Sequence, residues 1–515
     1  MAYTGRFKQM SSKLNNRSKN MRLVEMMERE MKKAYSRKSD SMIKSSLKKS
    51  ILICFIGLAL TEATMLSGCT AFHSDYVRPE LDEFVFVNGT SGMKSLNNQD
   101  SSEASANEEF SDNYWLKFND PKLNALIDEA LKSNNDYYQA VINVKKARVQ
   151  ANITDSALLP DFDVSLSSGL KKPLKSGVSR KESGSSLNVS YELDLFGRLS
   201  ADSKASAYNV EAKEYDAQTA RLTVTASVAS LYWQIVYYKD AIRLSENNLK
   251  DSNDTYKIMQ TRYDTGSISE LELLQAKTDL LEVNTTLAEQ RNNLQNAVSA
   301  LNLILNRVPD ATVDTAESLK DLTVPSVRAG LGSELLKNRP DVASAEALVK
   351  SALASTDATR LDMYPRFSLT AGLSAGSSSE LVQFFENPVA SIIAKLSLPF
   401  INYYKNSLQV DLAELEHDSA EMRFVTTYYK ALGEVYQSLN DIELDNVLLK
   451  NNYEKLQLNK KTEDLYRQKY EAGSVSLKDY LDAKKSRRAT ALILCKSKQN
   501  ALNNVVVLAK AMGGL

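Results

Sequence analysis

The side chains that most often carry chemistry are scarce in this sequence. Its 515 residues include only two histidines, His73 and His417, and three cysteines, Cys54, Cys69 and Cys495. Histidine is the commonest general base at neutral pH and the commonest metal ligand. The sequence also lacks a CxxC pair, a glycine-rich phosphate loop and the HExxH and GxSxG motifs. We therefore expect no enzymatic activity and no bound cofactor or metal.

One cysteine lies in a pattern that has its own chemistry. Lysines at positions 44, 48 and 49 precede an apolar run over 51–60, which is too short to cross a bilayer as a helix. This is the layout of a secretory signal, and it ends in Leu66-Ser67-Gly68-Cys69, which resembles a bacterial lipobox. In a lipobox the nucleophilic cysteine sulfur takes up a diacylglycerol. We expect Cys69 to be lipidated, the alternative being a buried cysteine at the end of a core helix.

This interpretation divides the N-terminal region into two segments. Residues 1–68 form a leader with a signal peptide; the basic stretch before Met42 fits neither a signal nor a domain, which makes Met42 an alternative start. Residues 69–113 form a lipid-anchored tether, because the chain from residue 88 is rich in Ser, Asn, Gly and Glu. Cys54 leaves with the leader, so Cys495 has no partner for an intramolecular disulfide.

The remaining sequence predicts very long helices. No proline occurs between Pro173 and Pro309, and Gly266 is the only glycine between Gly197 and Gly330. A helix over 199–263 would be about 97 Å long and would need a packing partner along its whole length, as in a coiled coil. Lysine plus arginine and aspartate plus glutamate number 64 each, which argues against a nucleic-acid-binding protein.

The second half of the chain repeats the first at a spacing of about 205 residues. Residues 262–269 match residues 469–476 position for position, and Pro160 and Phe162 recur as Pro365 and Phe367. We therefore predict one repeat over 114–309, a linker over 310–332 and a second repeat over 333–515.

Each repeat contains two short segments in which apolar and polar residues alternate. They lie near 163–170 and 185–193 in the first repeat and near 366–375 and 391–399 in the second. Strands of this length suit an outer membrane, although half-buried strands of a soluble domain are the alternative. Four strands cannot close a barrel, and an open edge cannot face lipid, so several subunits must contribute. A dimer would give eight strands with a filled interior, whereas the small polar residues favour the wider bore of twelve strands from a trimer.

The sequence resembles the TolC-like outer-membrane factors, in the lipidated branch that serves RND-type efflux systems (NodT-type outer-membrane efflux lipoproteins). The resemblance covers nearly everything from Cys69 to Leu515. The matching motifs are Tyr76-Val77-Arg78-Pro79, residues 115–121 at the start of the first helix, residues 191–198 between a strand and a long helix, and residues 336–342 in the second repeat.

The resemblance implies an α+β membrane protein that forms a homotrimeric tube. A 12-stranded transmembrane β-barrel, with four strands per subunit, would continue into a long α-helical coiled-coil barrel in the periplasm. The tube would be the passive exit duct for small molecules in a tripartite efflux system. It would sit among outer-membrane lipids and meet a periplasmic adaptor (membrane fusion) protein coupled to an inner-membrane RND-type pump.

Several residues take roles from this resemblance. Gly266 and Gly473 interrupt the helical pairs, and a glycine permits the left-handed backbone that joins two helices, so they mark the periplasmic tip turns. Asp482 matches the position at which one carboxylate per subunit narrows the closed channel, and Tyr470 matches a gate-associated aromatic. Asp479 lies one helical turn before Asp482 and is a further gate candidate. The alternative for Asp482 is a solvated helix charge.

A different class of function also explains part of the sequence. A lipid-anchored coiled-coil scaffold or adhesin without a pore would account for the lipobox, the tether and the long helices. It would not account for four strands placed symmetrically in two repeats.

Overall fold

The computed structural model describes residues 73–79, 81, 84–86, 93–95, 114–172, 177, 179–325, 336, 339–377 and 389–514. The chain divides into two compact units, Met1–Ala71 and Phe72–Leu515, and every described residue belongs to the second. The expected leader, Met42 and Cys69 lie outside the described residues. Within the expected tether, β1 (Phe84–Phe86) and β2 (Met93–Ser95) pair as a small antiparallel sheet.

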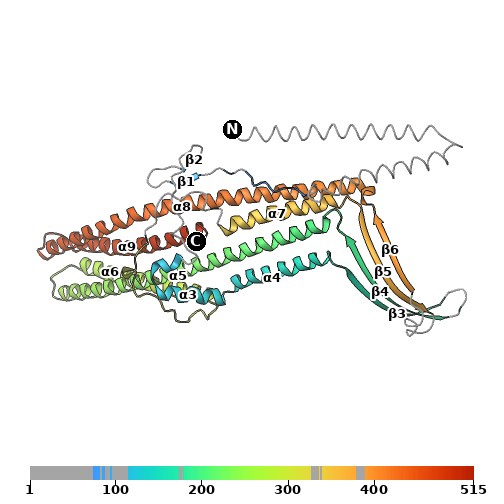
Figure 1. Cartoon of the computed structure of the whole chain (residues 1–515). Coiled ribbons are helices and arrows are strands. Elements are labelled where there is room, and N and C mark those ends of the chain that lie inside the picture. Colours follow the sequence, from blue (N-terminus) through green and yellow to red (C-terminus); the bar gives the residue numbers. More distant parts are fainter. Residues whose placement is uncertain are drawn as a thin grey trace. The chain divides into compact units, whose positions relative to one another are not determined.

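Long helices dominate the second unit and lie alongside one another (Figure 1). The helix that the sequence predicts over 199–263 extends one residue further at each end. None of the described helices is long and apolar enough to span a membrane. The helices are α3 (Pro121–Ser133), α4 (Asn135–Ser156), α5 (Arg198–Asp264), α6 (Glu270–Ile304), α7 (Pro340–Leu361), α8 (Tyr403–Glu471) and α9 (Leu477–Ala511).

Four strands form one antiparallel sheet in the chain order β3-β4-β5-β6. They are β3 (Asp161–Lys171), β4 (Arg180–Leu193), β5 (Arg366–Ser377) and β6 (Val389–Ser397), and each overlaps a segment that alternation predicts. Only β3 and β6 lie at the edges, so each has one side without a partner strand among the described residues. In Figure 1 the sheet extends from one end of the helices, and the α5–α6 and α8–α9 turns lie at the other end.

The strand register separates an apolar face of the sheet from a polar one. Apolar residues pair with apolar residues across all four strands, in the rows Phe162–Val189–Ala371–Ile392 and Val164–Leu187–Leu373–Ala390. The next row, Asp163–Asn188–Gly372–Ser391, is polar and points to the opposite face, because successive side chains of a strand alternate. Phe162, Val164 and Ile392 are 69%, 69% and 79% exposed, so no described part of the chain covers the apolar face over them.

The junction between sheet and helices is held by polar contacts. Asp194 follows β4 and accepts hydrogen bonds from the backbone N–H groups of Leu199 and Ser200 in the first turn of α5. Arg198 forms ion pairs with Glu192 of β4 at 2.8 Å and with Asp362, which follows α7, at 3.5 Å. These contacts fix the direction in which the long helix leaves the sheet.

The apolar core lies midway along the helices. Its larger cluster joins α3, α5, α6 and α9 around Tyr232 and Trp233, both fully buried. A 3-10 helix, Tyr114–Phe118, adds Phe118 against Trp233 with ring centroids 5.1 Å apart. Because Leu, Ile and aromatic side chains fill this cluster, it provides most of the large apolar burial in the helical part.

Helix ends meet head to tail beside this core. The Asn134 amide donates to the carbonyl of Ile304 at the end of α6, so α4 begins where α6 ends. In the same way Arg339 donates to the carbonyl of Ala511 at the end of α9, where α7 begins. The order helix, two strands, long helix, shorter helix thus occurs twice along the chain.

Candidate functional site

The two helix–turn–helix tips have the same backbone geometry. Gly266 and Gly473 have φ values of +68° and +72°, in the left-handed region that an L-residue adopts only at a cost. The Ser267 N–H donates to the carbonyl of Arg262, and the Ser474 N–H donates to that of Lys469, each at 2.8–2.9 Å. These bonds satisfy carbonyls at the helix ends, so glycine is required at both predicted turns.

Each tip also has a capping box that starts the returning helix. Ser269 exchanges hydrogen bonds with Glu272 at the start of α6, and Ser476 does so with Asp479 at the start of α9. The Asp479 carboxylate accepts hydrogen bonds from the Ser476 hydroxyl at 2.6 Å and from the Ser476 backbone N–H at 3.1 Å. These bonds, the hydroxyl's first, hold the pKa of the Asp479 carboxyl below its usual value. Asp479, which the sequence analysis names as a gate candidate, therefore caps the N-terminus of α9.

Asp482 is the expected gate carboxylate, and its side chain is exposed on α9. It makes no side-chain ion pair with any described residue. Lys485, one turn further along α9, instead reaches Glu282 of α6, with 2.6 Å between Nζ and Oε2. An exposed carboxylate that forms no ion pair with the described residues is available to face other copies of the chain.

Tyr470 lies at the contact between the two hairpins. Its hydroxyl accepts a hydrogen bond from Arg262 at 3.5 Å and approaches the Met259 sulfur at 3.4 Å. Its ring stacks on Tyr480 with centroids 6.0 Å apart, beside an apolar cluster of Met259, Ala276, Leu477 and Leu481. Burial raises the pKa of the Tyr470 hydroxyl, which therefore stays protonated at neutral pH. The candidate gate tyrosine thus joins α8 to α5.

The structure also shows a buried polar cluster, Arg488–Asp279–Ser252, that sequence reasoning missed. Arg488 of α9 donates through Nη1 to both carboxylate oxygens of Asp279 on α6, at 2.9 and 3.1 Å. Its Nη2 reaches the Ser252 hydroxyl of α5 at 2.6 Å, and Ser252 donates to Asp279 at 2.6 Å. The Arg488 and Asp279 side chains are only 7% and 10% exposed. One charged cluster thus ties α9 to both helices of the first hairpin.

Lys484 extends this contact by a second ion pair. Its ammonium lies 3.0 Å from Asp251 and 3.2 Å from the Thr255 hydroxyl of α5, and the residue is 1% exposed. The ammonium also lies 5.6 Å from the centroid of the Tyr480 ring. A lysine in a polar helical stretch resembles a solvated surface residue, so nothing in its sequence context marks it as buried.

One further group of potential metal ligands occurs in the described part of the chain. His417, Asp418 and Glu421 on α8 offer ligand atoms within 4.8 Å of one another. Asp418 is exposed, and all three residues come from a single helix. Exposed acidic groups of one helix are common without an ion, so we assign no site there.

Comparison with known proteins identifies the class of this fold. The family model described as outer membrane efflux protein matches residues 126–307 and 331–514. The chain is 30% identical to the cation efflux system protein CusC of Escherichia coli K12 over 78% of this chain and 90% of that protein. It is 27% identical to the probable outer membrane lipoprotein SilC of Salmonella typhimurium, over 89% and 98%.

The fold is also similar to that of a solved outer membrane channel. The CmeC outer membrane channel of Campylobacter jejuni superposes with a TM-score of 0.76 at 26% identity, covering 86% of this chain and 94% of that one. The similarity extends through both halves of the chain, so it includes the sheet, the long helices and both tips.

Proposed function

The chain belongs to the outer membrane efflux protein family, and we propose that three copies assemble so that their sheets close one twelve-stranded barrel across the outer membrane. The observation that carries this proposal is the four-stranded sheet with an uncovered apolar face and two unpaired edges among the described residues. Open edges cannot lie in lipid, because their backbone groups would have no hydrogen-bond partners. Pairing β6 of one copy with β3 of the next removes every edge.

The faces of the sheet support the orientation of this barrel. The apolar rows would face lipid, and the polar rows, such as the one that holds the pair Ser165–Ser186 with hydroxyl oxygens 2.8 Å apart, would line a water-filled bore. Small polar residues leave the bore open, which suits a passive duct.

Exposed apolar residues on the helices support assembly into a helical tube. Ile153 and Leu159 near the end of α4, and Leu408, Leu412 and Leu415 near the start of α8, are each at least 50% exposed. These helices continue into β3 and from β6, the two edge strands. Where β6 of one copy pairs with β3 of the next, α8 and α4 would pack together and bury these side chains.

The same comparisons support an internal two-fold repeat. The family model matches the chain twice, and the order of elements in the two matched regions is the same. The two tips with their glycine turns and capping boxes are then equivalent parts of one unit used twice.

The remaining parts of the system are assigned on family membership and sequence. A lipid on Cys69 would anchor the chain in the outer membrane, and the tips at Gly266 and Gly473 would meet a periplasmic adaptor coupled to an inner-membrane RND-type pump. Asp482 is exposed beside the tip, so one carboxylate from each copy would form a charged ring that narrows the channel, with Asp479 and Tyr470 nearby.

Planar-bilayer conductance of the purified mature chain, wild type beside Asp482→Ala, tests the channel and its gate. We expect discrete cation-preferring openings that become larger or more frequent in the mutant, because the carboxylate ring is lost. Lys485→Met is the matched control, since it removes an exposed charge one turn away. Openings that Asp482→Ala leaves unchanged would refute the gate and keep the channel.

Persistent silence from folded protein would instead favour the lipid-anchored scaffold or adhesin. No observation in the structure favours that alternative, because a scaffold has no use for a sheet whose apolar face is exposed.

A further inference from the structure

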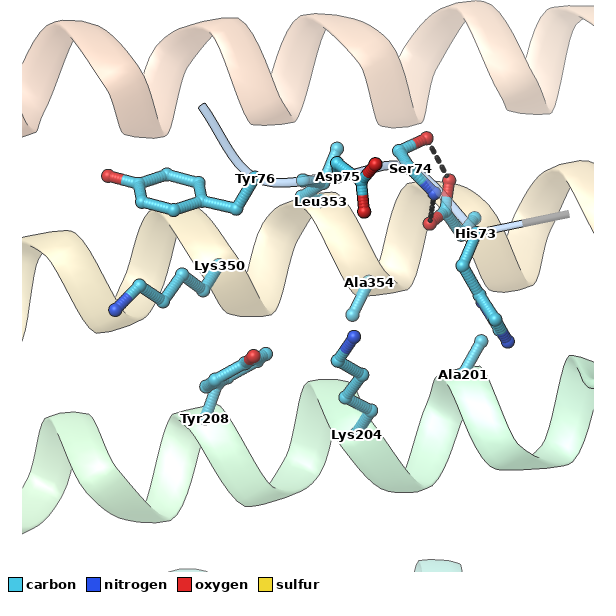
Figure 2. Close-up of a pocket in the computed structure, with 11 residues that line it drawn as sticks. His73, Ser74, Asp75, Tyr76, Ala201, Lys204, Tyr208, Lys350, Leu353 and Ala354 are labelled. Carbon is cyan, nitrogen blue, oxygen red and sulfur yellow. Dashed lines mark hydrogen bonds between the residues drawn. The ribbon is translucent and has the colours of Figure 1, made fainter. Parts of the chain in front are cut away.

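A polar cavity of about 120 Å³ lies between α5 and α7, near the sheet and far from the tips. The segment 73–76 runs along α7 and forms one wall, with His73, Ser74, Asp75 and Tyr76 (Figure 2). Lys204 and Tyr208 reach up from α5, and Lys350 projects from α7 into the same region (Figure 2). The volume admits a group several water molecules in size.

Lys204 and Lys350 are the lysines of this cavity, and they have weak ion-pair partners or none among the described residues. Lys204 forms no ion pair with any described residue and is exposed. Lys350 lies 3.7 Å from Glu346, but Arg78 lies closer to the same carboxylate, at 3.1 Å, and the Tyr76 hydroxyl donates to it as well. One carboxylate is thus shared by two cations, and Lys204 is a further cation that lines the same cavity.

The carboxylates of the cavity do not cancel this charge. Asp357 forms an ion pair with Arg360, whose Nη1 lies 3.2 Å from Oδ1, and its two oxygens also accept hydrogen bonds from the Ser74 N–H at 2.7 Å and the Ser74 hydroxyl at 2.6 Å. Asp75 is exposed at the rim, where water screens it. The cavity that Lys204 and Lys350 line therefore favours an anion.

The position of the cavity suggests the source of such an anion. Lys204 lies six residues into α5, about 9 Å from the helix start that follows β4. His73, which lines the cavity, lies close to Gly197 at the start of α5: a Cβ atom added to Gly197 would lie 3.2 Å from the His73 imidazole. If the sheet spans the outer membrane, the cavity faces the headgroup layer on the helical side. This placement rests on the proposed function, whereas the affinity for an anion does not.

The geometry points to a binding site for a phosphate group, carried by an anionic phospholipid headgroup, in the cavity lined by Lys204 of α5 and Lys350 of α7. A phosphate oxygen accepts charge-assisted hydrogen bonds from lysine ammonium groups, and the Tyr208 hydroxyl on the same helix offers a further donor. A lipid held there would join the first half of the chain to the second at the membrane boundary.

The test uses the full purified chain in non-ionic detergent near neutral pH and low salt. Inorganic phosphate and, separately, dihexanoyl phosphatidylglycerol are added, and broadening of the ³¹P resonance reports binding of each probe. We expect both probes to bind, and Lys204→Ala to raise each dissociation constant about tenfold or more, the loss of one charge-assisted hydrogen bond. Lys204→Arg should retain binding.

Two further variants make the test specific. Asp75→Asn should lower the dissociation constant, because it removes a like charge from the rim. Lys250→Ala removes an exposed lysine further along the same helix and should change nothing. A merely structural role of Lys204 would not produce opposite effects of Lys204→Ala and Asp75→Asn.

Each outcome decides the proposal. Binding of both probes that depends on Lys204 supports the headgroup site. Binding of inorganic phosphate alone keeps the anion site and overturns the lipid as its source. No broadening, or equal effects of Lys204→Ala and Lys250→Ala, overturns the site altogether. Bilayer conductance of Lys204→Ala should equal that of wild type, so a missing pore and a missing anion site are separate results.

Discussion

The Arg488–Asp279–Ser252 cluster predicts that Asp279→Ala loosens the contact between the two hairpins. The substitution removes both hydrogen bonds that Arg488 Nη1 makes to the carboxylate and leaves a guanidinium that is only 7% exposed. Asp251 lies 3.9 Å from Arg488 but already pairs with Lys484 at 3.0 Å, so two buried cations would share one half-exposed carboxylate.

The size of the effect follows from the burial of the pair. Breaking a buried ion pair from one side costs about 3–5 kcal/mol, because the remaining charge stays out of water. We take about 3 kcal/mol, since Asp251 retains part of the compensation. That amount shifts the equilibrium between docked and separated hairpins more than a hundredfold.

Hydrogen exchange of the backbone amides around Ser252 and Arg488 measures this shift in the intact protein. Lys485→Met is the control, because its pair with Glu282 is exposed and contributes at most about 1 kcal/mol. Asp279→Met combined with Arg488→Met should restore protection, since no buried charge then remains unpaired. Protection in Asp279→Ala equal to that in Lys485→Met would refute the reasoning.

Two other predictions concern the α8–α9 tip. Gly473→Ala should destabilise the turn by about 1–2 kcal/mol, because the φ of Gly473 is +72°. Gly433→Ala should instead stabilise α8 by up to about 1 kcal/mol, because this glycine lies inside the helix and no atom lies near the added methyl group. Amide hydrogen exchange should therefore show opposite changes in protection at the two positions, and equal changes would contradict this prediction. The lowered pKa of Asp479 means that its capping contribution is fully present above the ordinary pKa of 3.8 and is lost as the pH falls through the lower folded value. Protection of the first turn of α9 should therefore fall in acid below pH 3.8, and Asp479→Asn should abolish that pH dependence; an identical acid loss in the variant would argue against the cap.

Much of the fold follows from local patterns. A strand exposes alternate residues on opposite faces, so Phe367, Leu369 and Leu373 predict β5 and its apolar side without any knowledge of its neighbours. The absence of proline and glycine predicts α5, and the isolated Gly266 and Gly473 predict both turns, because each effect acts within a few residues.

The candidate site follows from sequence only in part. Gly266 and Gly473 could be named as turn residues from their places in the repeat, whereas Asp482 was named from the family resemblance and its role as a gate stays a prediction. The capping role of Asp479 had a local signal, a serine three residues before an acidic residue, as Ser269 and Glu272 also have. A local sequence signal for the capping role of Asp479 therefore existed, although the sequence analysis considered Asp479 only as a gate candidate.

The sequence by itself determined where the chain forms helices, strands and turns, because these depend on neighbouring residues. Only the tertiary structure decided which charges lie inside. Asp279, Lys484 and Arg488 resemble surface residues in their own helices, and they are buried because α5, α6 and α9 meet there. In the same way Lys204 and Lys350 line one cavity only because α5 packs against α7. Desolvation depends on surrounding helices remote in sequence, so no local pattern encodes it.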